Sequence, residues 1–195
     1  MNLPNQLTLA RIVLAFVFIG FFLVDSLWAK TIALVVFLAA ALTDLYDGYL
    51  ARKTGVVTGF GKFMDPLADK VLVTSALISF VALGYIKAWM VVVIIFREFM
   101  VTGLRLLAAY KGIVITPSFW AQVKTVLEMC TIALILLFTT LKVWLVPNGH
   151  NWGIFSSGWT FKSFNGLVFA AMLLSVATGI DYLVKNAPLL RGVLK

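Results

Sequence analysis

Charged residues are scarce in this sequence. Asp, Glu, Lys and Arg make up only 12% of its 195 residues, against about 25% in an ordinary soluble domain. Hydrophobic residues make up 62%, and the mean hydropathy is +1.03. This composition excludes an ordinary soluble domain and predicts an integral membrane protein.

Cysteine and histidine are almost absent, with one residue of each. A single Cys130 cannot form an intramolecular disulfide. His150 has no second His or Cys nearby, so a zinc site is not expected.

Long apolar runs recur along the whole chain. A helix needs about 20 mainly apolar residues to cross a hydrocarbon core of about 30 Å. Six such runs fit, each bounded by charge, Gly, Pro or aromatic clusters: residues 7–25, 31–51, 64–85, 88–108, 119–140 and 164–184. We expect an all-α integral membrane protein with six transmembrane helices, forming one domain over residues 1–195.

Lys and Arg are unevenly distributed among the predicted loops. Six spans place both termini on one side of the membrane. That side carries Arg52, Lys53, Lys62, Lys111, Lys185, Arg191 and Lys195, whereas the opposite loops carry Lys30, Lys87, Lys142 and Lys162. The bias predicts that the termini lie in the cytoplasm.

The net charge of +8 is strongly positive for a chain this apolar. It fits attraction of surface Lys and Arg to anionic lipid, or a pocket for an anionic substrate. No nucleic-acid partner is expected, because no basic run interleaves with exposed aromatic residues.

Acidic residues are few, and half of the eight lie in one stretch: Asp44, Asp47, Asp65 and Asp69. Helical spacing places the first two on one face near the end of the second span, and the last two on one face at the start of the third. A loop of about a dozen residues is expected between these helices. Carboxylates this near hydrocarbon are costly and by default mark a functional site.

Four converging carboxylates repel one another unless cations lie between them. Oxygen-only ligands select magnesium, manganese or calcium over zinc or copper. Such a set can hold two ions about 4 Å apart, as in two-metal phosphoryl-transfer sites. The alternative is four solvated acids at helix ends, or acids that are paired with Arg52, Lys53, Lys62 and Lys70.

Small residues and an arginine follow the first pair of aspartates. Gly48 and Ala51 remove side-chain bulk, which lets a ligand approach the backbone, and Arg52 offers a guanidinium suited to bidentate phosphate contact. Small residues in a membrane helix also serve helix packing, and for Ala51 this alternative stays open.

The spacing of these residues resembles the signature of the CDP-alcohol phosphotransferase family. Eight fixed positions match: Asp44-x2-Asp47-Gly48-x2-Ala51-Arg52-x8-Gly61-x3-Asp65-x3-Asp69. The resemblance covers essentially the full chain and implies a six-span membrane enzyme that moves a substituted phosphate from a CDP-linked donor to an alcohol. It also implies that the four aspartates hold two divalent cations, Mg²⁺ or Mn²⁺. Asp69 would in addition be the base for the acceptor hydroxyl, and the CDP pocket would be lined by Gly48, Ala51, Arg52 and Gly61.

Other stretches resemble one branch of that family, the bacterial phosphatidylglycerophosphate synthases. They are NLPNQLTLARI, FMDPLADKVLV and REFMVTGLR. In that branch a short interfacial helix precedes the first span, and Asn5 and Thr8 are expected to contact the nucleotide. An Asn after Pro is also an ordinary helix cap, so both interpretations of Asn5 stay open.

Three cations within apolar runs, Arg97, Arg105 and Lys124, indicate an anionic acceptor. Charged groups buried in a membrane need partners, and an acceptor phosphate supplies one. Glu98 and Glu128 are the competing partners, since a structural ion pair satisfies the same need.

The start of the fifth span departs from the branch pattern, which reads G-K-x-K-T with a glutamine before methionine. The stretch AQVKTVLEM keeps Lys124 and Thr125, both expected at the acceptor phosphate, but has Ala121, Gln122 and Glu128 at the other positions. The departure concerns the identity of the acceptor alcohol, sn-glycerol 3-phosphate in that branch, and leaves the family resemblance unchanged.

The resemblance implies transfer of the phosphatidyl group from CDP-diacylglycerol to sn-glycerol 3-phosphate by metal-assisted direct displacement, giving phosphatidylglycerol phosphate and CMP. The alternatives are a sister enzyme (a cardiolipin, phosphatidylserine or phosphatidylinositol phosphate synthase) and, more remotely, a divalent-cation carrier, which needs a pathway across the midplane. A homodimer in the bacterial inner (cell) membrane is expected, surrounded by membrane lipid, with its active site at the cytoplasmic face.

Overall fold

The structure is a computed structural model, and it describes most of the chain. The described backbone covers residues 3–54, 59–112, 115, 118–149, 152–155 and 157–194. Within it, side chains are described except at residues 3–5, 7, 44–54, 59–63, 65 and 188–194.

Six long helices make up the described fold, and no strand occurs among those residues. They are α1 (Leu3–Phe22), α2 (Leu27–Thr54), α3 (Gly59–Ala82), α4 (Ala88–Tyr110), α5 (Phe119–Leu145) and α6 (Gly158–Leu194), with a short 3₁₀ helix, η1 (Gly153–Phe155), before α6. Each apolar run in the sequence coincides with one helix, which confirms the all-α class.

Glycines mark the ends of three of these helices. Gly84, Gly112 and Gly149 have φ values of 74°, 78° and 82° and follow α3, α4 and α5. This left-handed conformation ends a helix at little steric cost only when no Cβ is present. The breaks between the apolar runs are therefore encoded locally.

Two boundaries differ from the sequence prediction. Helix α1 is unbroken, so the short interfacial helix expected before the first span is not a separate element. Pro4 is compatible with this, because N–H groups in the first helical turn have no intrahelical partner. The expected loop of about a dozen residues is also shorter, since α2 continues to Thr54 and α3 already begins at Gly59.

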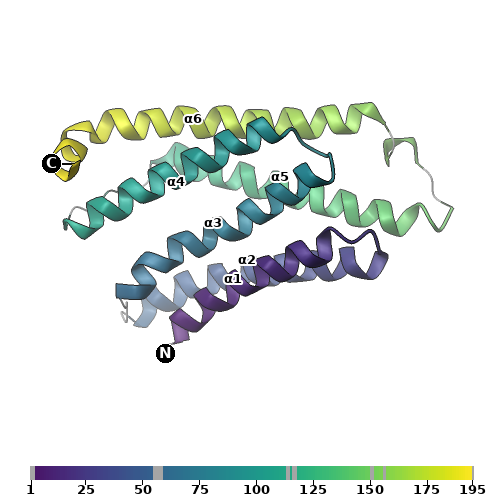
Figure 1. The fold of residues 1–195 in the computed structure, drawn as a ribbon, viewed down its shortest axis with the longest axis horizontal. Helices are drawn as coiled ribbons and strands as arrows, with labels where there is room; N and C mark the ends of the chain where they lie inside the picture. The colour runs from purple at the N-terminus through teal and green to yellow at the C-terminus, as the bar shows by residue number, and fades with distance from the viewer. Residues whose placement is uncertain are drawn as a thin grey trace.

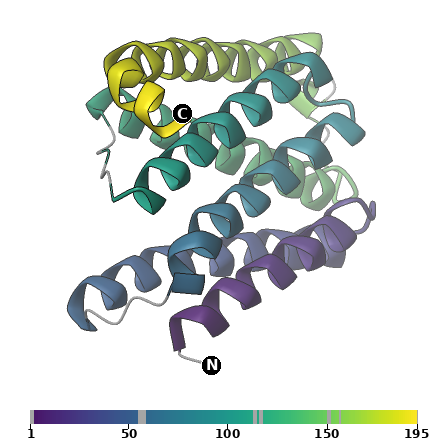
Figure 2. The ribbon, with the colours of Figure 1, turned by 60° about the vertical axis from the view of Figure 1, so that its left-hand side comes forward.

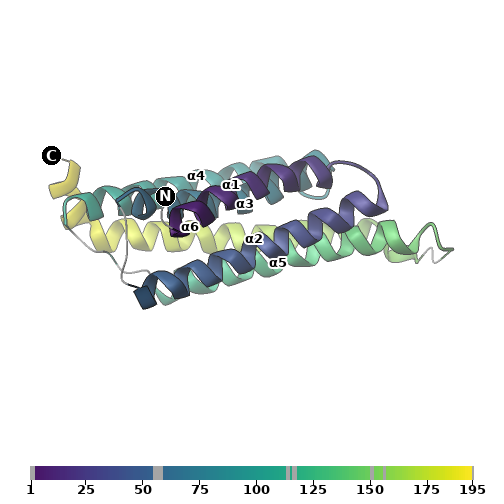
Figure 3. The same ribbon diagram turned by 90° about the horizontal axis from the view of Figure 1, so that it is seen from below.

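The helices lie side by side along the long axis of the molecule (Figure 1). Helix α1 packs on α2 and α3, while α4 and α5 pack on α6. Contacts of α3 with α4 and of α2 with α5 join these two groups (Figure 2). Both termini lie at the same end of the bundle (Figure 3), as an even number of spans predicts.

Aromatic rings fill the core near the C-terminal ends of α1 and α3. The ring centroids of Phe18 and Phe22 are 5.3 Å apart, those of Phe18 and Phe37 are 5.6 Å apart, and those of Phe22 and Phe80 are 5.5 Å apart. All four rings are buried. We call the half of the bundle that contains this cluster the apolar half.

Two helices are long and apolar enough to cross a membrane, judged by length and composition over the described residues. They are α5 and residues Gly158–Ala187 of α6, each with a mean hydropathy of 2.0. Shorter apolar stretches lie in α1 and α2, at Thr8–Phe22 and Leu27–Thr43. Large apolar side chains such as Phe96 are exposed on the outer faces. Such an exterior is that of a membrane protein.

Candidate active site

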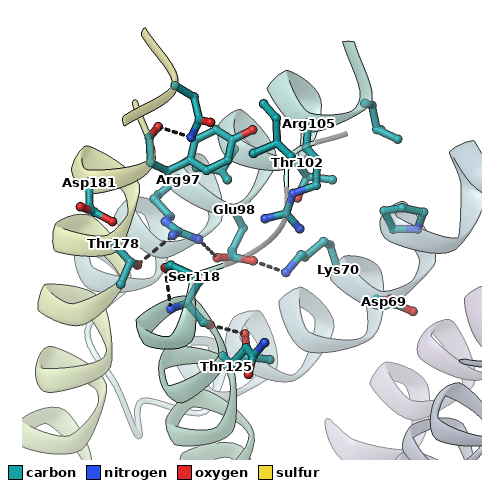
Figure 4. Close-up of a pocket in the computed structure, with 18 of the residues that line it drawn as sticks. Asp69, Lys70, Arg97, Glu98, Thr102, Arg105, Ser118, Thr125, Thr178 and Asp181 are labelled. Carbon is teal, nitrogen blue, oxygen red and sulfur yellow. Dashed lines mark hydrogen bonds and ion pairs between the residues drawn. The ribbon is translucent and has the colours of Figure 1, made fainter. Parts of the chain in front are cut away.

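A cavity of about 920 Å³ lies between α3, α4, α5 and α6 (Figure 4). This volume is within the range of about 300–1,000 Å³ that is usual for small-molecule sites. Its polar and charged lining includes Asp69 and Lys70 of α3, Arg97, Glu98 and Arg105 of α4, Thr125 of α5, and Thr178, Asp181 and Tyr182 of α6. We call it the charged cavity; it lies toward the end of the bundle that holds the termini.

Glu98 is the centre of the ion pairs around the charged cavity. One carboxylate oxygen accepts hydrogen bonds from Arg97 Nη1 at 2.7 Å and from Lys124 Nζ at 2.5 Å. The other accepts from Lys70 Nζ. Glu98 is 5% exposed, so water does not compete for these bonds. Three cations from three helices are therefore held around one carboxylate.

Lys124 lies behind the cavity wall rather than in it. It is 1% exposed and also pairs with Glu128, one turn further along α5, at 2.5 Å. A buried lysine without acidic neighbours would be costly, and here two carboxylates share its charge. The competing structural partners, Glu98 and Glu128, are thus the ones that Lys124 contacts.

Arg97 bridges α4 and α6. Its Nη2 donates a hydrogen bond to Thr178 Oγ1 at 2.8 Å, in addition to the bond from Nη1 to Glu98. Gly179 leaves room for this side chain, because a Cβ atom at that position would lie 3.0 Å from Arg97 Nε and 3.1 Å from its Cγ. The guanidinium is therefore fixed by two hydrogen bonds and by a close helix approach.

Arg105 differs from the other cations of the charged cavity. Its guanidinium carbon lies 5.9 Å from the ring centroid of Tyr182, and no ion pair joins Arg105 to an acid among the described side chains. Two acids of the cavity are paired separately, Asp69 with Arg11 and Asp181 with Lys185. Among the described side chains that remain, four cations (Lys70, Arg97, Arg105 and Lys124) face the two carboxylates of Glu98 and Glu128, a formal excess of two positive charges. A phosphomonoester dianion matches that excess.

Asp69 lines the other side of the charged cavity. Its carboxylate forms an ion pair with Arg11 of α1, which is 2% exposed. The Asp69 side chain itself is 41% exposed. Arg11 therefore holds this carboxylate in place while leaving it open to a bound molecule.

A family comparison decides what kind of protein carries this site. The family model described as CDP-alcohol phosphatidyltransferase matches residues 1–180. The chain belongs to this family. The resemblance seen in the spacing of the aspartates is thereby confirmed, and the chain is a phosphatidyltransferase enzyme. CDP-alcohol phosphatidyltransferases generally use divalent metal ions.

Curated relatives in the family carry related names. A CDP-diacylglycerol–glycerol-3-phosphate 3-phosphatidyltransferase of Bacillus subtilis (strain 168) is 40% identical over 186 residues, covering 81% of this chain and 95% of the relative. A protein of the same name from Rickettsia felis is 38% identical over 136 residues, covering 70% of this chain and 75% of the relative. A probable phosphatidylglycerophosphate synthase of Mycobacterium tuberculosis (strain H37Rv) is 36% identical over 188 residues, covering 94% and 81%.

The structure brings together part of the predicted CDP-alcohol phosphatidyltransferase site. Asp69, Arg97, Arg105 and Thr125 all line the charged cavity. Thr8 is buried in α1, three residues before Arg11. The remaining predicted residues have side chains outside the described part of the structure: Asn5, Asp44, Asp47, Gly48, Ala51, Arg52, Gly61 and Asp65. Their backbones lie in α1, α2 and α3, so the helical spacing assumed for both aspartate pairs is correct.

No three His, Cys, Asp or Glu side chains meet in a metal-binding arrangement within the described part of the chain. The side chains of three of the four predicted aspartate ligands, and all of His150, are outside that part. Asp69 is the one predicted ligand whose carboxylate is described, and it is an oxygen donor that suits a hard divalent cation.

Several contributors to the charged cavity were not assigned to it from the sequence, among them Lys70, Thr178 and Tyr182. A signal for two of them exists in α6, where Ser175, Thr178 and Tyr182 recur at helical spacing within an apolar run. That spacing places polar groups on one buried face. Lys70 follows Asp69 directly, and only the packing of α3 against α4 shows that it reaches Glu98.

Proposed function

We propose that this chain transfers the phosphatidyl group of CDP-diacylglycerol to sn-glycerol 3-phosphate, forming phosphatidylglycerol phosphate and releasing CMP. The names of relatives at 36–40% identity support this reaction. The observation that carries it is the charged cavity, which combines a partly exposed carboxylate, Asp69, with the four cations around Glu98 and Glu128 and their excess of two positive charges. A small acceptor that bears both a hydroxyl and a phosphate dianion fits both features.

The proposed reaction is a direct displacement at phosphorus. The acceptor hydroxyl oxygen forms a bond to the phosphatidyl phosphorus while the bond to the CMP oxygen breaks. The hydroxyl proton passes to the carboxylate of Asp69, which must lie within hydrogen-bond reach of it. CMP leaves with the bonding electron pair, so no covalent enzyme intermediate is needed.

The metal ligands in this proposal are Asp44, Asp47, Asp65 and Asp69, holding two divalent cations, Mg²⁺ or Mn²⁺. The donor set fits, because all four ligands offer only oxygen atoms. The two helices that carry them, α2 and α3, follow one another in the chain, with four residues between Thr54 and Gly59. When bound, such ions neutralise the diphosphate and the departing phosphate oxygen.

The acceptor phosphate is bound, in this proposal, by Arg105 together with Arg97 and Lys70. Arg105 has the strongest case, since it has no acidic partner among the described residues and a guanidinium matches a phosphate bidentately. Thr125 lines the same cavity. Lys124 contributes from behind the wall, by sharing Glu98 with Arg97 and Lys70.

The CDP moiety of the donor is assigned to Asn5, Thr8, Gly48, Ala51, Arg52 and Gly61. This assignment rests on the family signature and on the position of these residues in α1, α2 and α3. Arg11 lies one turn after Thr8 and pairs with Asp69, so α1 connects the nucleotide side with the acceptor side.

All six helices are proposed to span the bacterial inner (cell) membrane as one domain over residues 1–195. The charged cavity then opens at the cytoplasmic face, because it lies toward the end of the bundle that carries the termini. That end also carries more Lys and Arg, as the cytoplasmic side of a membrane protein does. We propose a homodimer surrounded by membrane lipid.

The test measures CMP release by the purified protein in detergent with CDP-diacylglycerol and Mg²⁺, with and without sn-glycerol 3-phosphate. We expect release that depends on glycerol 3-phosphate, stops with a chelator and returns with Mg²⁺. Asp69→Asn should lower the rate by about 10²–10⁴-fold, the usual range for a general base. Asp25→Asn, an exposed acid in the α1–α2 turn, is the matched control and should keep the wild-type rate.

The alternatives give different results in this assay and in a liposome flux assay. Release with serine, inositol phosphate or phosphatidylglycerol, and not with glycerol 3-phosphate, would identify a sister enzyme. A divalent-cation carrier would release no CMP with any alcohol but would pass Mn²⁺ into liposomes.

A further inference from the structure

The two cavity arginines of α4 are both held by one face of α6. Arg97 and Arg105 lie about two helical turns apart on α4. Facing them on α6 are Thr178, which accepts a hydrogen bond from Arg97 at 2.8 Å, and Tyr182, whose ring centroid lies 5.9 Å from the Arg105 guanidinium carbon. Thr178 and Tyr182 are one turn apart, so a single surface of α6 contacts both guanidinium groups.

The hydroxyl of Thr178 is oriented to accept from Arg97. Its Oγ1 donates within α6, with the carbonyl oxygens of Leu174 at 2.8 Å and Ser175 at 3.0 Å as acceptors. Because the hydroxyl proton points to the helix backbone, the oxygen lone pairs face Arg97 Nη2. Thr178 therefore selects one orientation of the guanidinium.

Tyr182 carries a buried hydroxyl group at the wall of the charged cavity. The residue is 8% exposed and lines the charged cavity, yet its hydroxyl has no hydrogen-bond partner among the described residues. Buried hydroxyl groups are nearly always paired, so an exception at a cavity wall points to a bound molecule. Tyr182 also lies just beyond residues 1–180, which the family model matches, so family membership assigns it no role.

We infer that Thr178 and Tyr182 determine the affinity for the acceptor phosphate. Thr178 is a positioning residue that orients Arg97, while Tyr182 holds Arg105 by its ring and donates its hydroxyl hydrogen bond to the phosphate. This rests on the proposed function, in which the charged cavity binds the phosphate of the acceptor.

The test uses Thr178→Val and Tyr182→Phe, which remove one hydroxyl each and keep the shape of the side chain. In each variant the KM for sn-glycerol 3-phosphate should rise about tenfold, the usual weight of a hydrogen bond to a charged group. The KM for CDP-diacylglycerol should not change. Thr178→Ser, which keeps the hydroxyl, should restore the wild-type KM.

Thermal stability separates this role from a merely structural one. The Tyr182 hydroxyl has no hydrogen-bond partner among the side chains and backbone that the structure describes, so Tyr182→Phe should unfold at the same temperature as the wild type or higher. The matched controls are Tyr85→Phe and Thr140→Val, which lie far from the charged cavity, and both should keep the wild-type KM for each substrate.

Three outcomes would overturn the inference. They are an unchanged acceptor KM in both variants, an equal rise in the KM of both substrates, or no rescue by Thr178→Ser. If the wild-type chain itself shows no release dependent on glycerol 3-phosphate, the proposed function fails instead, and that result is visible before any variant is made.

Discussion

The same helices build two very different interiors at the two ends of this bundle. Helix α3 carries Lys70 in the charged cavity and Phe80 in the apolar half, and α4 passes from buried Met90 to Arg97 and Glu98 within three turns. Whether a buried side chain is apolar or charged therefore depends on its position along a helix, and each of these two helices contributes to both interiors. One end provides packing, and the other provides a site.

The two interiors depend on different kinds of contact. In the apolar half, rings such as Phe18, Phe22 and Phe80 meet by non-directional packing, so several side chains of similar volume could fill the space. In the charged cavity, Glu98 accepts directed bonds from three cations, and removing Glu98 takes away the carboxylate that all three share. The comparison predicts that the two ends respond differently to substitution.

The largest contrast should come from Glu98→Ala compared with Phe80→Ala. Both should destabilise the protein by about 3–5 kcal/mol, the first by leaving buried cations unpaired and the second by opening a cavity. We expect Glu98→Ala also to raise the KM for sn-glycerol 3-phosphate, because Lys70 and Arg97 lose their common partner. Folded Phe80→Ala protein should keep the wild-type KM. Thermal unfolding in detergent and CMP-release kinetics measure the two effects.

Arg105→Ala should have the next largest effect, confined to binding. A hydrogen bond to a charged group contributes about 1.5–3 kcal/mol to binding, so its loss should raise the acceptor KM by about 10–100-fold. The donor KM should stay constant. Stability should hardly change, since no acid in the described structure pairs with Arg105. An equal rise in both KM values would place the acceptor elsewhere. Exposed Lys111 at the end of α4 gives the control, Lys111→Ala.

Gly179→Ala should have a smaller effect on the acceptor KM, and this effect should be specific to the charged cavity. The new Cβ atom would lie 3.0 Å from Arg97 Nε, so the guanidinium has to shift against Glu98 and Thr178, at a cost of about 1 kcal/mol, the low end for overpacking. We expect a rise of a few-fold in acceptor KM. Gly20→Ala, where a Cβ atom would meet nothing within 4 Å, should change neither KM. An unchanged acceptor KM in Gly179→Ala would mean that the position of Arg97 does not matter for binding.

Lys30→Met should have the smallest effect. Lys30 is the buried cation of the opposite end, where its Nζ donates to the carbonyl oxygen of Phe22 at 2.5 Å and lies 4.4 Å from the Phe22 ring centroid. Methionine loses that bond to the end of α1 but keeps the packing, so stability should fall by about 1 kcal/mol. A change in the KM of either substrate would show that the two ends are coupled.

Much of the fold could be predicted because its signals are local. Each run of apolar residues became one helix, and Gly84, Gly112 and Gly149 mark where three of them end. The length of α2 and α3 was underestimated, because Gly55, Gly59 and Gly61 indicate a loop in the sequence, whereas α3 already begins at Gly59.

The site could be predicted only in part. Asp69, Arg97 and Arg105 were expected at a functional site, since a charge within an apolar run is costly enough to stand out. Thr125 was expected at the acceptor phosphate from the branch pattern that it matches. The sequence left open whether Lys124 contacts an acceptor or an acid. The structure pairs it with Glu98 and Glu128, and that choice depends on how α4 packs against α5.

By itself, the sequence determined that this is a helical membrane protein of one family with a cluster of aspartates near one boundary. Composition, apolar run length and the spacing of eight signature residues are properties of the chain read in order, and they need no knowledge of packing. Only the tertiary structure decided that Glu98 gathers Lys70, Arg97 and Lys124, and that Thr178 and Tyr182 of α6 face the arginines of α4. These partners are up to 81 residues apart in the chain, and a directed bond over that separation exists only once the helices have packed.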